Sequence, residues 1–147
     1  MSFIIPAKET VKAILILMHG YGTSASDFAQ IGDYFSKHCS NIEVHILDAF
    51  HEMNGPNCRC WFDLESNNLS DWKTNIQPAG DELVKYIDKV LDSHKGLSYK
   101  NVILSGFSQG AMMSLHVGLM KNVGAIVAFS GLLLDQSVVK RTNIDTD

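Results

Sequence analysis

The serine at position 108 stands where its hydroxyl could serve as a nucleophile. Ser108 is the centre of Gly-Phe-Ser-Gln-Gly at residues 106–110, which follows a short apolar run at 102–104 and precedes a helical pattern. A Gly-x-Ser-x-Gly turn between a strand and a helix lifts the serine hydroxyl above the end of a sheet. The serine backbone in such a turn is strained, so its neighbours must be small. We therefore expect covalent chemistry at Ser108 rather than an ordinary glycine-rich turn.

A second glycine-containing turn, His-Gly-Tyr-Gly at residues 19–22, follows the apolar run 12–18. Such a loop can point backbone N–H groups into a cleft, where they stabilise the oxyanion of acyl transfer. The carboxyl ends of parallel strands meet on one side of a sheet, so we expect the two turns to converge. The expected oxyanion donors are the backbone N–H groups of Tyr21 and Gln109. Taken alone, residues 19–22 would fit an ordinary strand-to-helix turn equally well.

Apolar runs typical of strands alternate along the chain with patterns typical of helices. A helix capped by Ser26 is expected to about His38, and another has an apolar stripe from Ile76 to Leu91 with Pro78 in its first turn. The expected strands are residues 2–5, 12–18, 42–47, 102–104 and 125–129. This alternation predicts the α/β class, with a mostly parallel sheet, helices on both faces and one domain over residues 1–147. Residues 49–68 lack a period and are expected to form a long functional loop.

The composition fits a globular protein and argues against several functions. Hydrophobic residues are 46% and charged residues 19%, and the net charge is -4. No basic stripe is visible, so we do not expect a nucleic-acid partner. The longest apolar run, residues 13–18, is too short to span a membrane, and residues 1–10 lack the pattern of a signal peptide.

The cysteines indicate free thiols and give little support for a metal. Their number is odd, and Cys58 and Cys60 could form only half of a zinc site, because no second pair has suitable spacing. Free thiols are typical of a reducing compartment, so a cytoplasmic location is expected. We expect neither a metal nor an organic cofactor.

A base for Ser108 is hard to find. In enzymes with this turn, the acid and the histidine follow the serine, yet only His116 does so here. It lies about 12 Å along the same helix and is expected to be buried against the sheet. His19 is expected to shape its glycine turn rather than to act as the base. His51, in the long loop, is no better a candidate for the base.

Several segments together resemble the carboxylesterase/phospholipase family of α/β-hydrolases, which includes the acyl-protein thioesterases. The similar segments are, in order, residues 19–22 (HGYG), 60–63 (CWFD), 106–111 (GFSQGA) and 129–131 (FSG). The resemblance implies hydrolysis of carboxylic esters or thioesters, with Ser108 as nucleophile and Tyr21 and Gln109 as oxyanion donors. It also places Trp61 near the acyl pocket, and we add Phe107 as a second expected substrate contact.

Members of this family continue well beyond Phe-Ser-Gly, with loops that carry an aspartate and a histidine and with further strands. The resemblance therefore implies an incomplete α/β-hydrolase fold without the Asp and His of the triad. The expected substrate is a small-molecule or lipid acyl ester. Strand 125–129 would be left with an open edge, so a second copy of the chain or a complementing C-terminal fragment is an expected partner. The alternative function is a catalytically silent remnant, or a split-gene fragment, that binds acyl ligands or a partner chain.

Overall fold

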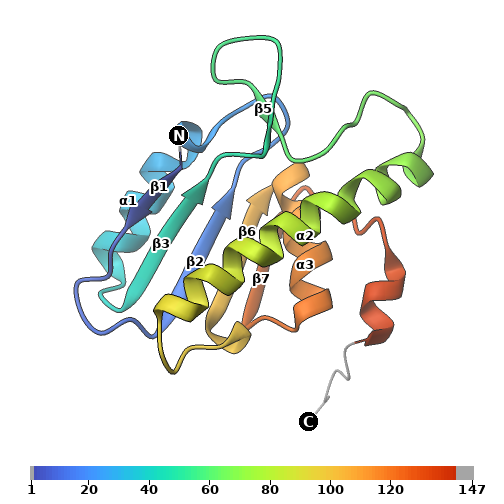
Figure 1. Cartoon of the computed structure of the whole chain (residues 1–147). Helices are drawn as coiled ribbons and strands as arrows, with labels where there is room; N and C mark the ends of the chain where they lie inside the picture. Colours follow the sequence, from blue (N-terminus) through green and yellow to red (C-terminus); the bar gives the residue numbers. More distant parts are fainter. Residues whose placement is uncertain (1, 142–147) are drawn as a thin grey trace.

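A computed structural model describes residues 2–141, which contain a five-stranded sheet in the order β1-β3-β2-β6-β7 (Figure 1). β1 pairs antiparallel with β3, and the other neighbours are parallel. The mostly parallel sheet is therefore confirmed. The strands are β1 (Phe3–Ile5), β2 (Ala13–Met18), β3 (Ile42–Leu47), β6 (Val102–Phe107) and β7 (Ala125–Phe129).

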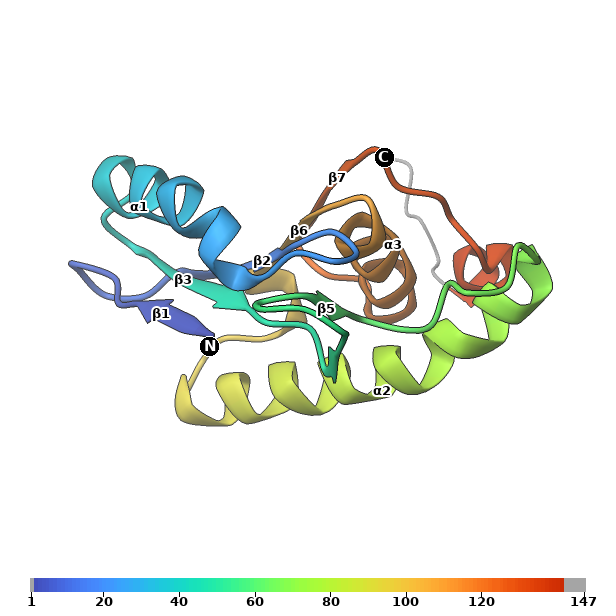
Figure 2. The same cartoon turned by 90° about the horizontal axis from the view of Figure 1, so that it is seen from above.

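Helices cover both faces of this sheet, as predicted (Figure 2). One face carries α1 (Ala29–His38), and the other carries α2 (Leu69–Ser93) and α3 (Gln109–Lys121). Short 3-10 helices span Ala25–Phe28, Tyr99–Asn101 and Gln136–Arg141.

The position of β2 in the centre of the sheet explains why its residues are all apolar, with no alternation of apolar and polar side chains. Ile14, Ile16 and Met18 pack into the core beneath α2 and α3, whereas Leu15 and Leu17 join the smaller cluster on the α1 side. A strand that is buried on both faces has no solvent side on which to place polar residues.

The predicted helix starts are wrong. The long helix α2 begins at Leu69, seven residues before Ile76, because the Asn68 side chain caps it by accepting from the Ser70 N–H at 2.9 Å. Pro78 therefore lies inside this helix rather than in its first turn. In the first helical region Ser24, not Ser26, is the capping residue, and it opens the 3-10 turn that precedes α1.

The segment 49–68 is not entirely irregular. It contains a short antiparallel ribbon of β4 (His51–Glu52) and β5 (Arg59–Cys60), and Thr23 forms a bridge with Arg59. The ribbon thus attaches the long segment to the loop that follows β2.

The described C-terminal segment packs against α3 rather than along β7 (Figure 1). Val138 is buried, and the Asp135 carboxylate lies 3.1 Å from the Lys73 ammonium of α2. Within residues 2–141 no strand pairs with the outer side of β7, so the expected open edge is confirmed for this part of the chain.

Candidate active site

Ser108 has the strained backbone that its sequence motif predicts. It lies between β6 and α3 with φ 51° and ψ −112°, a conformation that L-residues rarely adopt. Hydrogen bonds hold it there: its N–H donates to the Phe129 carbonyl at 2.9 Å, and its carbonyl accepts from the Met112 N–H at 3.0 Å. Strain of this kind persists only where the surroundings enforce it, and it is concentrated at functional sites.

The two glycines of the motif are required by close backbone approaches. A Cβ atom on Gly106 would lie 2.3 Å from the carbonyl carbon of Gly110. A Cβ atom on Gly110 would lie 2.2 Å from the carbonyl oxygen of Met18, at the end of β2. The start of α3 therefore rests directly on the backbone of two neighbouring strands.

The two turns converge, as their positions after parallel strands predicted. A Cβ atom on Gly20 would lie only 3.6 Å from Cβ of Ser108. Gln109 is the first residue of α3, where a backbone N–H has no partner within the helix. The N–H of Tyr21 also makes no hydrogen bond to any residue in the described part of the chain. Two unpartnered donors thus lie on the segments that flank Ser108, and the positive end of α3 lies beside them.

His19 is locked as a neutral ring. The Ala49 N–H donates to Nε2 at 2.9 Å, so Nδ1 carries the proton and donates to the Gly20 carbonyl at 2.7 Å. Burial of the ring lowers the pKa of His19 below its usual value, despite that second hydrogen bond. Both nitrogens are occupied, so His19 shapes the turn and is not free to accept a proton from Ser108.

Trp61 and Phe107, the expected substrate contacts, lie in different environments. Trp61 is completely buried, and its indole N–H donates to the His19 carbonyl at 2.9 Å. It therefore supports the glycine turn from below, and its place near the acyl pocket stays a prediction. Phe107 is 49% exposed beside the elbow, and its role in substrate binding stays a prediction.

The side chain of Gln109 makes contacts that the sequence did not suggest. It is completely buried; its Oε1 accepts from the backbone N–H of Trp61 at 2.8 Å, and its Nε2 donates to the Phe62 carbonyl at 2.6 Å. The sequence interpretation gave Gln109 a backbone role alone. The available signal was a long polar side chain at the first, buried turn of an otherwise apolar helix.

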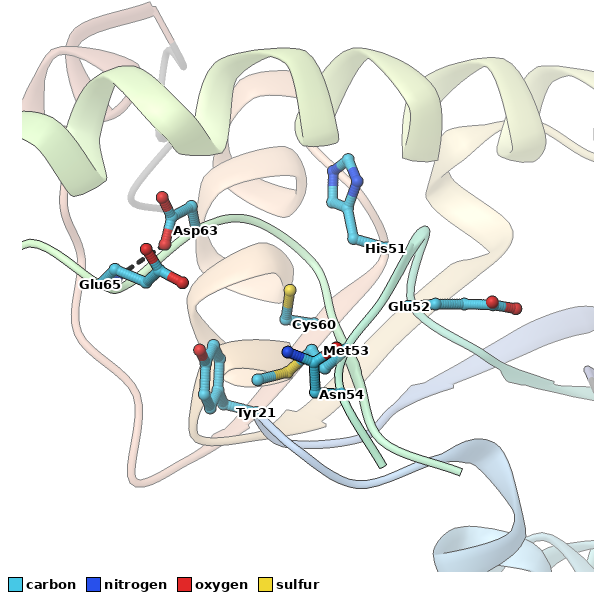
Figure 3. Close-up of a pocket in the computed structure, with 8 residues that line it drawn as sticks. All are labelled: Tyr21, His51, Glu52, Met53, Asn54, Cys60, Asp63 and Glu65. Atoms are coloured by element: carbon cyan, nitrogen blue, oxygen red, sulfur yellow. Dashed lines mark hydrogen bonds between the residues drawn. The ribbon is translucent and has the colours of Figure 1, made fainter. Parts of the chain in front are cut away.

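A cleft of about 390 Å³ opens beside the aromatic ring of Tyr21 (Figure 3). Its wall includes both strands of the β4–β5 ribbon and the acidic residues Asp63 and Glu65. Burial, reinforced by these two carboxylates, raises the pKa of the Cys60 thiol, so this cysteine is a poor nucleophile. The lining residues are Tyr21, His51, Glu52, Met53, Asn54, Cys60, Asp63 and Glu65.

Comparison with known proteins places this geometry in a family. The family model for Phospholipase/Carboxylesterase matches residues 1–146. The chain belongs to this phospholipase/carboxylesterase family.

Named relatives and solved structures agree with this assignment. Acyl-protein thioesterase 1 of Kluyveromyces lactis is 28% identical over 162 residues, covering 94% of this chain and 67% of the relative. Acyl-protein thioesterase 1 of Saccharomyces cerevisiae is 26% identical, covering 92% of this chain and 63% of its own length. The crystal structure of esterase PE8 has 30% identity and a TM-score of 0.81, and the match covers 90% of this chain and 64% of that one. The chain thus spans about two thirds of the length of these proteins.

In this phospholipase/carboxylesterase chain, no described histidine or carboxylate forms a hydrogen bond with Ser108 of the kind that a catalytic base makes. The Ser108 hydroxyl has no hydrogen-bond partner within residues 2–141. His116 is buried as expected, although its ring lies against Gly80 of α2, where a Cβ atom would be 2.8 Å from Cδ2. His51 is exposed on β4.

Neither a metal-binding cluster nor a membrane-spanning helix is present in the described part of this family member. Residues 2–141 contain no group of at least three His, Cys, Asp or Glu side chains arranged to hold a metal ion. None of their helices combines the length and hydropathy needed to cross a bilayer. All three cysteines are free thiols, as predicted.

Proposed function

We propose that this chain carries the nucleophile and the oxyanion hole of a serine hydrolase that cleaves carboxylic esters or thioesters. The observation that carries this proposal is the strained Ser108 beside two unpartnered backbone N–H groups, those of Tyr21 and Gln109. Membership of the phospholipase/carboxylesterase family supports it. Residues 1–147 are proposed to form one domain.

In the proposed reaction Ser108 Oγ forms a bond to the acyl carbonyl carbon, and the carbonyl oxygen gains the negative charge. The N–H groups of Tyr21 and Gln109 donate to this oxyanion. Collapse of the intermediate breaks the bond to the leaving alcohol or thiol and leaves an acyl-serine, which water then hydrolyses. Since no described histidine forms a hydrogen bond with Ser108 Oγ, the Ser108 proton passes to solvent, solvent in turn protonates the leaving group, and the isolated chain is expected to react slowly.

The proposed substrate is a small-molecule or lipid acyl ester or thioester. The names of the yeast relatives, acyl-protein thioesterases, favour the thioester. Free cysteines favour a reducing compartment, and we propose the cytoplasm.

A second candidate function is binding of acyl ligands or of a partner chain without catalysis. The observation that favours it is the lack of a base: both nitrogens of His19 are occupied, and Ser108 Oγ has no partner among residues 2–141. If the chain only binds, the strained conformation of Ser108 is retained as part of the fold, and the serine does not catalyse hydrolysis.

Hydrolysis of 4-nitrophenyl acetate separates the two functions. An oxyanion hole and binding alone leave a rate of roughly 10³–10⁴-fold over water. We expect a rate of that order, lost in Ser108→Ala and kept in the control Ser130→Gly, which changes another serine with positive φ after a strand. A rate unaffected by Ser108→Ala would favour the silent binder. Turnover at ordinary esterase rates would show that the chain does supply a base.

A further inference from the structure

We propose that the side chains of Gln109 and Trp61 are positioning groups that together fix the separation of the two oxyanion donors. This inference rests on the proposed function, because it concerns the N–H groups of Tyr21 and Gln109. The sequence and the family resemblance assign neither side chain to this task.

The regular sheet does not extend far enough to position the two donors. The last paired residues of β2 and β6 are Met18 and Gly106. Tyr21 and Gln109 each lie three residues beyond that pair, on segments that leave the sheet in different directions. Backbone pairing between these two strands therefore cannot set the distance between the donors.

The Gln109 carboxamide supplies the first half of the missing connection. It bonds the start of α3 to two consecutive peptide groups, accepting from the Trp61 N–H and donating to the Phe62 carbonyl. Because both ends of the amide are used, a small shift of residues 61–62 relative to the elbow would break at least one of these bonds.

The Trp61 indole supplies the second half. Its Nε1–H donates to the carbonyl of His19, which belongs to the peptide leading into Gly20. The His19 ring in turn accepts from the Ala49 N–H and donates to the Gly20 carbonyl. A continuous series of hydrogen bonds thus runs from Gln109 through Trp61 to the turn that carries Tyr21.

Burial makes this series rigid. The side chains of Gln109, Trp61 and His19 are all 0% exposed, so water cannot replace a broken bond. An unpaired polar group in such a place is costly, and each member is therefore held to its partner. The series begins at the side chain of one donor residue, Gln109, and ends at the His19 and Gly20 carbonyls that precede the other donor, Tyr21, which distinguishes it from a general contribution to the core.

The chain offers a matched control in its other tryptophan. The indole N–H of Trp72 also donates to a backbone carbonyl, that of Ser66, but this bond lies at the start of α2 and touches neither turn. Trp61→Phe and Trp72→Phe each remove one indole donor and keep an aromatic ring. Gln109→Met is a second variant of the series, and Ile87→Val in the core under α2 serves as a mildly destabilised reference.

The experiment measures the Ser108-dependent hydrolysis of 4-nitrophenyl acetate, as kcat and KM separately, together with the melting temperature. With no described base, this slow rate reports on the oxyanion hole almost alone. We expect Trp61→Phe and Gln109→Met to lower kcat about 10- to 100-fold with little change in KM, as for displaced or lost oxyanion donors. Trp72→Phe and Ile87→Val should keep the parent kcat.

Several results would overturn the inference. Unchanged kcat in both Trp61→Phe and Gln109→Met would show that the donors are positioned without the series. A loss that Ile87→Val reproduces at equal melting temperature would show a purely structural effect. If Trp61→Phe does not fold, a benzothiophene analogue of tryptophan at position 61 removes the N–H and keeps the ring shape. Hydrolysis that survives Ser108→Ala would overturn the proposed function, and the inference with it.

Discussion

The backbone N–H of Ser108 donates a hydrogen bond of 2.9 Å to the carbonyl of Phe129, the last residue of β7. The strained residue is thereby attached to the edge of the sheet. β6 and β7 pair as far as Phe107 and Phe129, so the ladder ends immediately below this bond. The conformation of Ser108 therefore depends on a strand that has a partner on one side only within the described residues.

The first prediction separates steric need from backbone strain among the glycines. Gly110→Ala should destabilise the protein by about 2–4 kcal/mol, because the new methyl group would meet the Met18 carbonyl. Gly22→Ala is the matched control: Gly22 has φ +74° and open space around it, so the cost should be only about 1 kcal/mol. Urea unfolding measures both. An equal decrease in the free energy of unfolding in the two variants would mean that the start of α3 can move away from β2.

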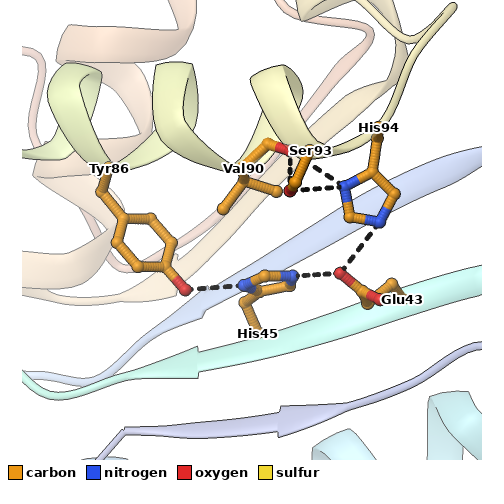
Figure 4. A network of polar contacts seen from close by, with 6 residues as sticks. All are labelled: Glu43, His45, Tyr86, Val90, Ser93 and His94. Carbon is orange, nitrogen blue, oxygen red and sulfur yellow. Dashed lines mark hydrogen bonds and ion pairs between the residues drawn. The ribbon is translucent and has the colours of Figure 1, made fainter.

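A partly buried polar network around the buried His45 joins β3 to the C-terminal part of α2 (Figure 4). His45 Nε2 lies 2.8 Å from a Glu43 carboxylate oxygen, and the same oxygen lies 3.3 Å from His94 Nε2. A carboxylate only accepts, so His45 Nε2 carries the proton, and Nδ1 accepts from the Tyr86 hydroxyl at 2.6 Å. Burial, helped by the Glu43 charge, raises the pKa of Tyr86 to about 12, so its hydroxyl stays a donor.

The second prediction tests this network by deleting one hydroxyl. Tyr86→Phe should cost about 1–3 kcal/mol, because it leaves the buried Nδ1 of His45 without a donor. Tyr99→Phe removes a similar hydroxyl, bonded to Asp88 at 2.6 Å near the surface, and should cost less than about 0.5 kcal/mol. Chemical denaturation of the two variants gives the comparison. A larger loss in Tyr99→Phe would contradict the assigned tautomer of His45.

The third prediction concerns acid. Burial lowers the pKa of His19, His45 and His116 below the ordinary value of 6.5. The unfolded chain therefore binds more protons than the native protein once the pH falls below 6.5, and the free energy of unfolding decreases there. Above that pH this contribution to stability is complete. For the three rings together, the free energy of unfolding can change by up to about 4 kcal/mol per pH unit, because each proton contributes about 1.4 kcal/mol per pH unit.

Urea unfolding between pH 7.5 and pH 5 measures this slope. His116→Gln should reduce it by up to about 1.4 kcal/mol per pH unit, because one buried ring no longer titrates. His38→Gln replaces an exposed histidine in the same way and is the control for the substitution itself. A slope that His116→Gln does not alter would mean that this ring is already protonated, or accessible to water, in the native protein.

The features that could be predicted from the sequence are those that a short local pattern of residues determines. A strand buried on both faces has to be apolar throughout, so β2 could be recognised from residues 13–18 alone. The elbow was recognisable because Gly-x-Ser-x-Gly specifies its own backbone. Convergence of the two turns then followed from parallel pairing, which puts the ends of β2 and β6 together.

Other features depend on contacts between distant segments. Gln109 and the Trp61–Phe62 peptides are almost fifty residues apart, so no spacing could indicate that the buried amide joins them. The bond from the Trp61 indole to the His19 carbonyl joins residues 42 positions apart and was likewise not predictable from spacing. The start of α2 was misjudged because Pro78 was taken as a first-turn residue, although the apolar positions Leu69 and Trp72 already continue the stripe of Ile76.

The last prediction concerns self-association through β7. This strand, Ala125–Phe129, contains neither a charge nor a proline, and Val127 and Phe129 are 42% and 58% exposed. Beside it, an apolar groove of about 710 Å³ runs between α1 and the β6–β7 face. An open, uncharged strand edge is a template for pairing with another chain. We propose that a second copy of the chain pairs there, and we expect concentration-dependent oligomers in sedimentation velocity at micromolar protein.

Val127→Lys should shift these oligomers towards monomer, because it puts a charge on the apolar face next to the edge. Ile4→Lys is the control: Ile4 is 58% exposed on β1, at the opposite edge, and its replacement should leave the association unchanged. Loss of association in Ile4→Lys alone would assign the contact to β1. A monodisperse parent monomer with a cooperative melt would contradict the prediction, and rapid amide exchange along β7 would then show that water satisfies its outer N–H groups.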